Sequence, residues 1–292
     1  MIHSELLRIR YSTAARVIGV LALVVLVGQA LLLALLPVVI DGLVALNEVV
    51  PNATEADQMS GSDLAAFSLE NTSVQMAVAD LTGSTAGGIA GAAVLVCVFA
   101  GLMIANEFRR GSIIATMLSF PRRYDAVSGK VAALTIVVLA SCVVLAVLRL
   151  AILFLGARLQ DVPIELSVTA VAATWGRGAL ALVFLTLAAA GLALLVRTPA
   201  ATLSVVVVVA VIEASARPVM SLLVDGWNPT RALPFGLVSE AVSSPELASV
   251  GLPSAAPDPV LALVVLAAWA VVLLGAGCLR TVRSDVFTPQ QA

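Results

Sequence analysis

A polar stretch between two long apolar runs holds the residues best suited to contact another molecule. It reads Glu107-Phe108-Arg109-Arg110-Gly111, then an apolar turn, then Pro121-Arg122-Arg123-Tyr124-Asp125 and Gly129-Lys130. Five of the chain's sixteen basic residues fall in this stretch. Because apolar runs long enough to cross a bilayer flank it, we interpret it as a cytoplasmic hairpin that a partner protein binds.

The remaining inventory argues against several kinds of enzyme. The only histidine, His3, lies outside the apolar runs, which argues against a Ser–His protease and a His-ligated metalloprotease. The only lysine, Lys130, is followed by valine, whereas a nucleotide-binding P-loop needs Gly-Lys-Ser/Thr. Cys97, Cys142 and Cys278 lie singly in apolar runs, so we expect neither a metal site nor a redox pair. We expect no enzyme activity from this chain by itself.

One charged pair stands inside an apolar run. Glu213 and Arg217 are four residues apart, which permits an ion pair on a helix, and an unpaired charge at mid-bilayer costs roughly 2.5–3.5 kcal/mol. The pair is either a polar gate or cationic-substrate contact on a transport pathway, or a pin for a helix break at Pro218. Gln29 is a second pathway candidate, with an interhelical hydrogen bond as the alternative.

Composition places this chain in a membrane. Its 292 residues are 61% hydrophobic and 12% charged, and the mean hydropathy is +1.09. A soluble domain could not bury so much apolar surface. The net charge of −2 gives no support for a nucleic-acid partner. A preference for arginine over lysine in an Ala- and Val-rich chain indicates a GC-rich bacterial source.

Six apolar segments are long enough to span a bilayer, which takes about 20 residues. They are Val17–Ile40, Thr85–Ala105, Ala126–Leu148, Gly178–Val196, Pro199–Val224 and Pro259–Leu279. The first is too long for a cleavable signal peptide and is expected to stay as a span. The third could extend to Leu155 and the fourth could begin at Ser167, which would leave Arg149 and Arg177 snorkelling near the outer boundary.

The charge distribution orients these spans. In a six-span layout eleven basic residues share one side, whereas the segment 41–84 on the other side has seven acidic residues and no basic one. The eleven are Arg8, Arg10, Arg16, Arg109, Arg110, Arg122, Arg123, Lys130, Arg197, Arg280 and Arg283. The positive-inside rule then makes both termini cytoplasmic. We therefore expect one all-α integral membrane domain over residues 1–292, in the bacterial cytoplasmic membrane.

Three segments outside the spans have their own patterns. Residues 1–16 read as an interfacial helix with Ile2, Leu6, Ile9 and Thr13 on one face, the alternative being a flexible basic tail. Residues 214–258 mix prolines with apolar pieces, which favours a broken, re-entrant segment. Within 41–84, apolar residues at helical spacing predict a helix that lies on the membrane or caps the protein, with Ser62 or Asp63 as its N-cap. They are Leu64, Phe67, Val74, Val78 and Leu81.

The polar stretch resembles a known family. Glu107-Phe108-Arg109-Arg110-Gly111-Ser112-Ile113, with Pro121-Arg122-Arg123 and Gly129-Lys130, is similar to the first cytoplasmic loop of ABC exporter permeases of the type-2 membrane-subunit family. In that family a Glu–aromatic–basic–x–Gly–Thr/Ser stretch follows the second span, and a Pro–basic stretch and a lysine precede the third. The six-span layout agrees with this resemblance, whereas the long acidic segment after the first span departs from the shortest members.

The resemblance implies a coupling helix within residues 106–125 that docks on a separate ATPase. Ile113, Met117 and Phe120 recur at helical spacing with Ile114 and Leu118 alongside, giving an apolar knob between two Arg pairs. The implied coupling residues are Glu107, Phe108, Arg109, Arg110, Gly111, Ile113, Ile114, Met117, Leu118, Phe120, Pro121, Arg122 and Arg123. Two permease copies, joined by two ATPase copies that bind ATP and Mg²⁺, would enclose a pathway lined by spans one, two and five.

The expected function is export of a hydrophobic or amphipathic substrate such as a drug, peptide antibiotic or lipid. Two alternatives stay open: an ATP-independent carrier or channel that uses Glu213, and a membrane immunity or interaction protein that transports nothing. The loop itself could be a positive-inside loop whose charges only fix topology. That simpler interpretation leaves Glu107, the placement of Gly111 and the apolar helix between Arg pairs unexplained.

Overall fold

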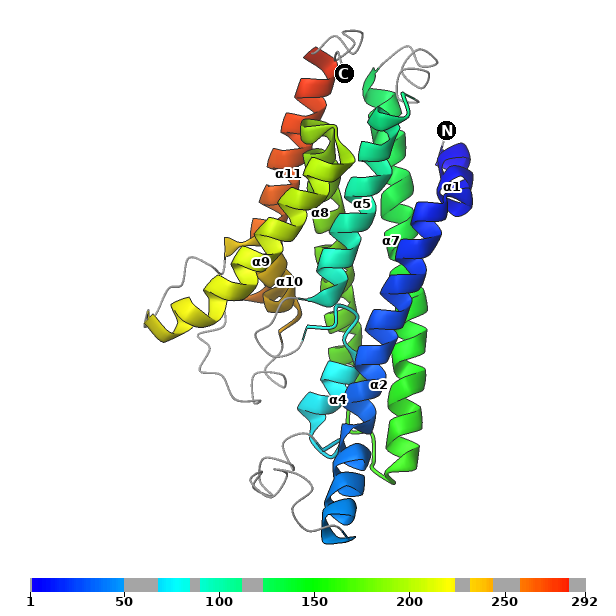
Figure 1. The fold of residues 1–292 in the computed structure, drawn as a ribbon, viewed down its shortest axis with the longest axis vertical. Helices are drawn as coiled ribbons and strands as arrows, with labels where there is room; N and C mark the ends of the chain where they lie inside the picture. Colours follow the sequence, from blue (N-terminus) through cyan, green and yellow to red (C-terminus); the bar gives the residue numbers. More distant parts are fainter. Residues whose placement is uncertain are drawn as a thin grey trace.

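A computed structural model of the chain describes residues 2–49, 68–84, 90–111, 123–223, 232–243 and 258–283. Every regular element in those ranges is a helix, and six of the helices are long and apolar enough to cross a membrane. Figure 1 shows the long helices gathered into an elongated bundle, with α9 inclined away from the rest. The predictions of an all-helical protein and of six spans are confirmed for these residues.

The helix bounds extend several of the predicted spans. The helices are α1 (Ile2–Tyr11), α2 (Thr13–Val49), α4 (Thr72–Ala79), α5 (Gly91–Arg109), α7 (Arg123–Leu159), α8 (Val168–Val196), α9 (Pro199–Leu223), α10 (Pro234–Val242) and α11 (Pro259–Arg283). The longer versions of spans three and four are the ones observed, because α7 passes Leu155. Ser167 is the N-cap of α8, and its hydroxyl accepts a hydrogen bond from the Ala170 amide at 3.0 Å.

Helix α8 is the centre of the bundle, and it packs most closely against α11. A Cβ atom added to Gly191 would collide with the backbone of Leu273 and Leu274, and one added to Gly277 would lie 2.6 Å from the Gly191 carbonyl oxygen. The two helices therefore touch backbone to backbone, which only glycine permits at these positions. Helix α5 lies on another side of α8 and joins the same apolar core.

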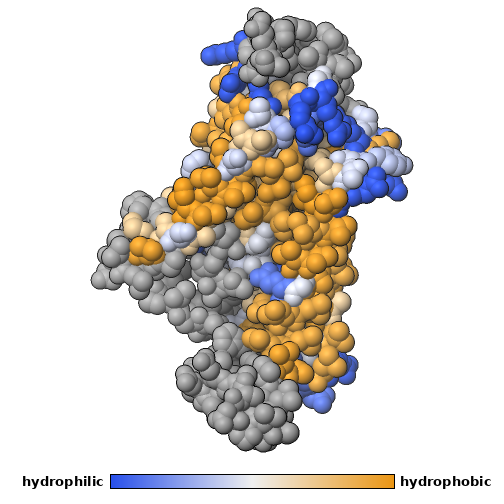
Figure 2. Space-filling view, viewed as in Figure 1, coloured by the Kyte–Doolittle hydropathy of each residue, from blue (hydrophilic) through white to orange (hydrophobic). Residues whose placement is uncertain are grey.

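The outer faces of the bundle are apolar. Large aliphatic side chains are exposed on several helices. Examples are Val143 and Val147 on α7, Val168 on α8 and Val271 on α11. Figure 2 shows a broad hydrophobic band along the molecule, with hydrophilic residues gathered at the end that carries α1 in Figure 1. Such a surface needs lipid as its solvent, so the chain is a multi-pass membrane protein.

The two ends of the bundle differ as the charge pattern predicts. Helix α1, the end of α5, the start of α7 and the end of α11 lie at one end, whereas α4 and the α7–α8 junction lie at the other (Figure 1). Basic residues at the first end include Arg8, Arg110 and Arg283. The assignment of this end to the cytoplasm stays a prediction.

Arg149 does not snorkel, and that expectation is wrong. Its side chain is fully buried, and its guanidinium donates hydrogen bonds to the carbonyl of Leu26 at 3.1 Å and that of Val78 at 3.3 Å. The last carbonyls of a helix have no hydrogen-bond donor within the helix. Arg149 supplies a donor to one of these carbonyls, that of Val78 in α4. Arg177, the other arginine expected to snorkel, is partly exposed.

The short helix α4 caps the bundle instead of lying on its surface. Six of its eight residues are buried. Its N-cap is Asn71, whose side-chain oxygen accepts from the Ser73 amide at 3.1 Å. Residues 68–71 form a turn, so no helix begun at Ser62 or Asp63 continues into α4. Those two residues, with Leu64 and Phe67, lie outside the described residues.

Buried Gln75 ties α4 to the α7–α8 junction. Its amide nitrogen donates to the carbonyls of Leu69 at 2.8 Å and Pro163 at 3.0 Å, and its oxygen accepts from the Glu165 amide at 3.1 Å. Both amide hydrogens and one lone pair of the amide oxygen of this buried side chain are thus used between two segments. This is why α4 holds its place at the end of the bundle.

Pro218 was expected to kink or break its helix. Helix α9 continues through Pro218 to Leu223, so a break there is wrong, and a kink stays a prediction. A proline in a helix removes one hydrogen bond and strains a turn, and the flanking turns of α9 keep their helical path. The short helix α10 follows, with Pro234 in its first turn and six of its nine residues buried. It packs against α8 and α11. A short covered helix thus lies between spans five and six. The broken, re-entrant character expected for residues 214–258 stays a prediction.

Candidate functional site

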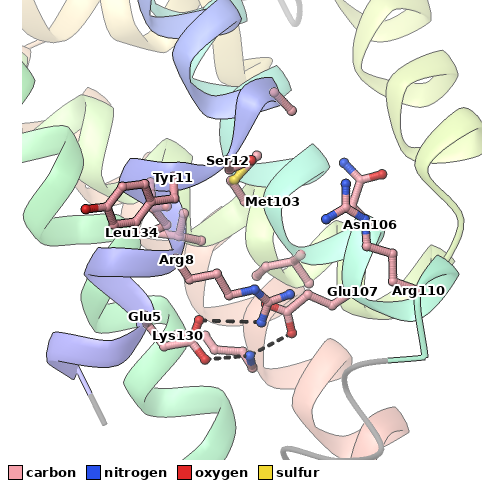
Figure 3. Close-up of a pocket in the computed structure, with 13 residues that line it drawn as sticks. Glu5, Arg8, Tyr11, Ser12, Met103, Asn106, Glu107, Arg110, Lys130 and Leu134 are labelled. Atoms are coloured by element: carbon pink, nitrogen blue, oxygen red, sulfur yellow. Dashed lines mark hydrogen bonds and ion pairs between the residues drawn. The ribbon is translucent and has the colours of Figure 1, made fainter.

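Four charged side chains meet where α1, α5 and α7 come together, and we call them the α1–α5–α7 cluster. They are Glu5, Arg8, Glu107 and Lys130 (Figure 3). The Lys130 ammonium lies 2.6 Å from one Glu107 oxygen and 2.8 Å from one Glu5 oxygen. The Arg8 guanidinium lies 2.8 Å from the other Glu107 oxygen and 3.7 Å from Glu5. Each carboxylate therefore contacts both cations.

Local sequence places these four groups together. Glu107 lies in the last turn of α5 and Lys130 in the early turns of α7, so residues 112–122, the middle of the expected cytoplasmic loop, fall between them in the chain. Glu5 and Arg8 are three residues apart and share one side of α1. Helix α1 ends at Tyr11, and the Ser12 hydroxyl accepts from the Ala15 amide at 3.4 Å as α2 begins. This junction lets α1 turn away from α2 and pack on α7.

The cluster is largely withheld from solvent. The exposed fractions of the side chains are 7% for Glu107, 8% for Lys130, 13% for Glu5 and 39% for Arg8. Charges buried to this degree need partners, and two carboxylates with two cations satisfy one another. The arrangement is suited to holding three helix ends in a fixed relation.

The described part of the loop continues from this cluster. Phe108 is partly buried, and the Arg197 guanidinium lies 5.7 Å from the centre of its ring. Burial, and then the charge of Arg280, lower the pKa of Arg197. Arg109 and Arg110 are exposed, and Gly111 adopts φ +67°, a backbone conformation that favours glycine. The left-handed backbone conformation thus explains why a glycine stands at position 111.

Seven of the expected coupling residues lie outside the described residues. They are Ile113, Ile114, Met117, Leu118, Phe120, Pro121 and Arg122. Arg123 begins α7, and its side chain is not among those described. The structure therefore places Glu107 to Gly111 at the base of the loop, and the coupling helix itself stays a prediction.

A second ionic group, the α9–α10 cluster, comprises Glu213, Arg217 and Glu240. The ion pair expected from the spacing is present, with Arg217 Nε 3.3 Å from a Glu213 oxygen. Arg217 also reaches Glu240 on α10 at 3.4 Å. The Glu213 carboxylate is fully buried and accepts hydrogen bonds from the backbone amides of Phe235, at 3.1 Å, and Gly236.

This geometry makes Glu213 a cap for the N-terminus of α10. The first amides of a helix lack partners within the helix and carry partial positive charge, so a carboxylate there is stabilised twice. A Cβ atom added to Gly236 would collide with the Arg217 guanidinium, so the glycine leaves room for that side chain. Of the two interpretations offered for Glu213 and Arg217, a structural anchor agrees better with these contacts, although what it anchors is α10 and not a break at Pro218.

Gln29 makes a hydrogen bond between α2 and the turn that follows α4. Its amide nitrogen donates to the Gly83 carbonyl at 2.9 Å. Gly83 has φ +64°, and a side chain there would collide with the Gln29 amide. The alternative to a pathway role for Gln29 was an interhelical hydrogen bond. The observed hydrogen bond is similar, but its acceptor is a loop carbonyl and not a group on a second helix.

Sequence reasoning missed the roles of three members of these two clusters. Glu5 and Arg8 carried a detectable signal, since they stand three apart on one side of an amphipathic segment. Glu240 carried none, because its partner is far away in the chain. Across the described ranges, no group of three or more His, Cys, Asp or Glu side chains is arranged to hold a metal ion.

The fold and these sites define a multi-pass, all-helical membrane protein with two buried ionic clusters. No protein-family model matches the chain, and no curated protein matches it. Function therefore has to be argued from its own residues.

Proposed function

We propose that this chain is the membrane-spanning permease subunit of a bacterial ABC exporter. One observation carries the proposal: the α1–α5–α7 cluster braces both ends of the loop 112–122. The ion pair between Glu107 and Lys130 joins the helix before the loop to the helix after it, at 2.6 Å. Glu5 and Arg8 add α1 to the same brace.

Such a brace suits a loop that transmits force. A partner that pushes on a loop with a soft base moves only the loop, whereas a stiff base passes the displacement to the helices attached to it. Glu107 would then be needed for its contacts on both sides of the loop. A loop that only fixed topology would need its arginines and would not need a buried carboxylate.

The remaining assignments follow from the family resemblance. A separate ATPase would bind ATP and Mg²⁺ and dock on Ile113, Met117 and Phe120, since this chain has no P-loop. A second permease copy would complete a pathway lined by spans one, two and five. The apolar walls suit a hydrophobic or amphipathic substrate such as a drug, peptide antibiotic or lipid.

The test is a pull-down of the full chain from its native membrane in a gentle detergent, with mass spectrometry of stoichiometric partners. Met117→Asp places a charge on the expected apolar face of the loop. Ser119→Asp is its matched control, because a helical projection puts Ser119 on the opposite side of the same segment. We expect a P-loop ATPase with the unmodified chain and with Ser119→Asp, and its loss with Met117→Asp.

Two results would overturn the proposal. Recovery of the intact chain without any ATPase would favour a carrier, a channel or a non-transporting protein. Recovery of the ATPase in equal amounts with both variants would show that the loop is not the docking element.

A further inference from the structure

A cleft opens beside the α1–α5–α7 cluster, and its lining is part basic and part apolar. Its volume is about 280 Å³, near the lower limit for small-molecule sites. Arg8, Arg110, Asn106 and Ser12 supply hydrogen-bond donors along its wall (Figure 3). This volume is small for a drug-sized substrate and sufficient for a compact polar group.

The charges around the cleft leave an excess of cations. Arg8, Lys130 and Arg110 stand against the two carboxylates of Glu5 and Glu107. Each carboxylate already contacts both Arg8 and Lys130. Arg110 is exposed and lies outside this set of ion pairs, four residues from Asn106 on the same side of α5. The pattern favours an anionic ligand with several acceptor oxygens.

The floor of the cleft lies in the membrane-spanning part of the helices. Met103 and Ile104 belong to the span of α5, and Leu134 belongs to the span of α7. Ser12, where α1 ends and the first span begins, also lines the cleft. A ligand would therefore meet basic donors and apolar side chains within one cleft, and these suit the phosphate and the acyl chains of a phospholipid. Basic pockets between transmembrane helices are recognised binding sites for lipid headgroups.

We propose that this cleft binds the phosphate of an anionic phospholipid, with the Arg110 guanidinium and the Asn106 amide as donors and the apolar floor against an acyl chain. The site needs a bilayer and does not need the ATPase, so it is independent of the permease assignment. Free phosphate shares the headgroup chemistry but lacks the apolar part.

The experiment counts lipids on the delipidated full chain by native mass spectrometry during titration with dioleoyl phosphatidylglycerol or dioleoyl phosphatidylcholine. Arg110→Gln removes the proposed donor, and Arg109→Gln is the matched control, because Arg109 is also exposed but does not line the cleft. We expect one phosphatidylglycerol per chain to bind about fivefold more weakly to Arg110→Gln than to the unmodified chain. Arg109→Gln should bind it as the unmodified chain does.

Three outcomes would overturn the proposal. Equal weakening by the two substitutions would indicate general attraction of a basic surface for anionic lipid. Equal affinity of the unmodified chain for the two lipids would remove the role of the anionic headgroup. Thermal stabilisation by inorganic phosphate that equals stabilisation by phosphatidylglycerol, and that Arg110→Gln abolishes, would identify free phosphate as the ligand.

Discussion

Each of the two ionic clusters holds a buried carboxylate, and the two carboxylates are satisfied by different kinds of partner. In the α9–α10 cluster a fully buried Glu213 is satisfied by backbone amides of α10 as well as by Arg217. In the α1–α5–α7 cluster Glu107 is satisfied by the Arg8 and Lys130 side chains. A backbone amide is fixed by its helix, whereas a side chain can follow its partner through a change of rotamer.

This difference assigns the clusters different mechanical roles. A carboxylate on the end of a helix cannot separate from it without exposing amides that have no other partner. A group of side chains can shift while each charge keeps a partner. We therefore interpret the α9–α10 cluster as a fixed anchor for one short helix. We interpret the α1–α5–α7 cluster as a joint: its ion pairs hold three helix ends together and stay formed while a displacement passes to those helices.

The largest effect should come from removing the Glu213 carboxylate. Glu213→Leu leaves two amides of α10 without their acceptor and leaves Arg217 with Glu240 as its only carboxylate partner among the described residues, which should lower the free energy of unfolding by about 3–5 kcal/mol. Glu213→Gln keeps one acceptor oxygen and should cost less. Thermal and denaturant unfolding of the purified chain in detergent measures both. A loss below about 1 kcal/mol for Glu213→Leu would contradict the anchor.

The interaction free energy between Glu107 and Lys130 should be the next largest effect. A double-mutant cycle of Glu107→Gln with Lys130→Met should give an interaction free energy of about 2 kcal/mol, because the two buried groups are in contact. Unfolding in detergent again supplies the four values. As a control, Arg109→Gln with Lys130→Met should be additive, since exposed Arg109 is not a member of the cluster. Additivity in the first cycle would remove the brace on which the permease proposal depends.

Activity should separate the clusters more clearly than stability. With the ATPase partner in hand, Glu107→Gln should lower transport-coupled ATP hydrolysis about tenfold, the order of a typical coupling free energy. Glu213→Gln should leave the rate per folded molecule close to that of the unmodified chain. The measurement is ATPase turnover in proteoliposomes, corrected for the amount of folded protein.

The opposite pattern would reverse the assignment. A normal rate in Glu107→Gln with a large loss in a folded Glu213→Gln would make Glu213 part of a gate or a substrate contact. Unchanged transport by a folded Glu213→Gln variant would contradict the hypothesis that Glu213 is part of a gate.

Features that depend on local spacing could be predicted from the sequence. The six spans follow from apolar runs, the Glu213–Arg217 pair from a separation of four residues, and the Ser167 cap of α8 from residue type at a helix start. Each of these signals lies within one helix or at its end. The charge asymmetry between the two ends of the bundle could also be predicted, because it depends only on the order of the spans.

Features that depend on distant partners could not be predicted. Arg149 looked like a snorkelling residue because nothing near it in sequence identifies the carbonyls of Leu26 and Val78 as its partners. The apolar spacing from Leu64 to Leu81 gave no sign that Asn71 is the N-cap of α4. The contact of Lys130 with Glu5 joins residues 125 positions apart. Tertiary packing decides such cases.

The smallest expected effect tests how open each cluster is to solvent. Arg8 is 39% exposed, so Arg8→Gln should cost only about 0.5–1 kcal/mol at low salt. Arg217 is 13% exposed, and its pair with Glu213 is covered by protein. Raising salt from 0.1 M to 1 M shortens the screening length from about 10 Å to about 3 Å, which weakens exposed pairs far more than buried ones. The cost of Arg8→Gln should therefore shrink with salt, and that of Arg217→Gln should stay constant.

Unfolding of both variants at two salt concentrations measures this difference directly. If both costs fell together, water and ions would reach both clusters equally, and the contrast between an anchor and a joint would lose its physical basis. If neither fell, Arg8 would be held as firmly as Arg217. The α1–α5–α7 cluster would then be a second anchor, and the two clusters would not differ in mechanical role.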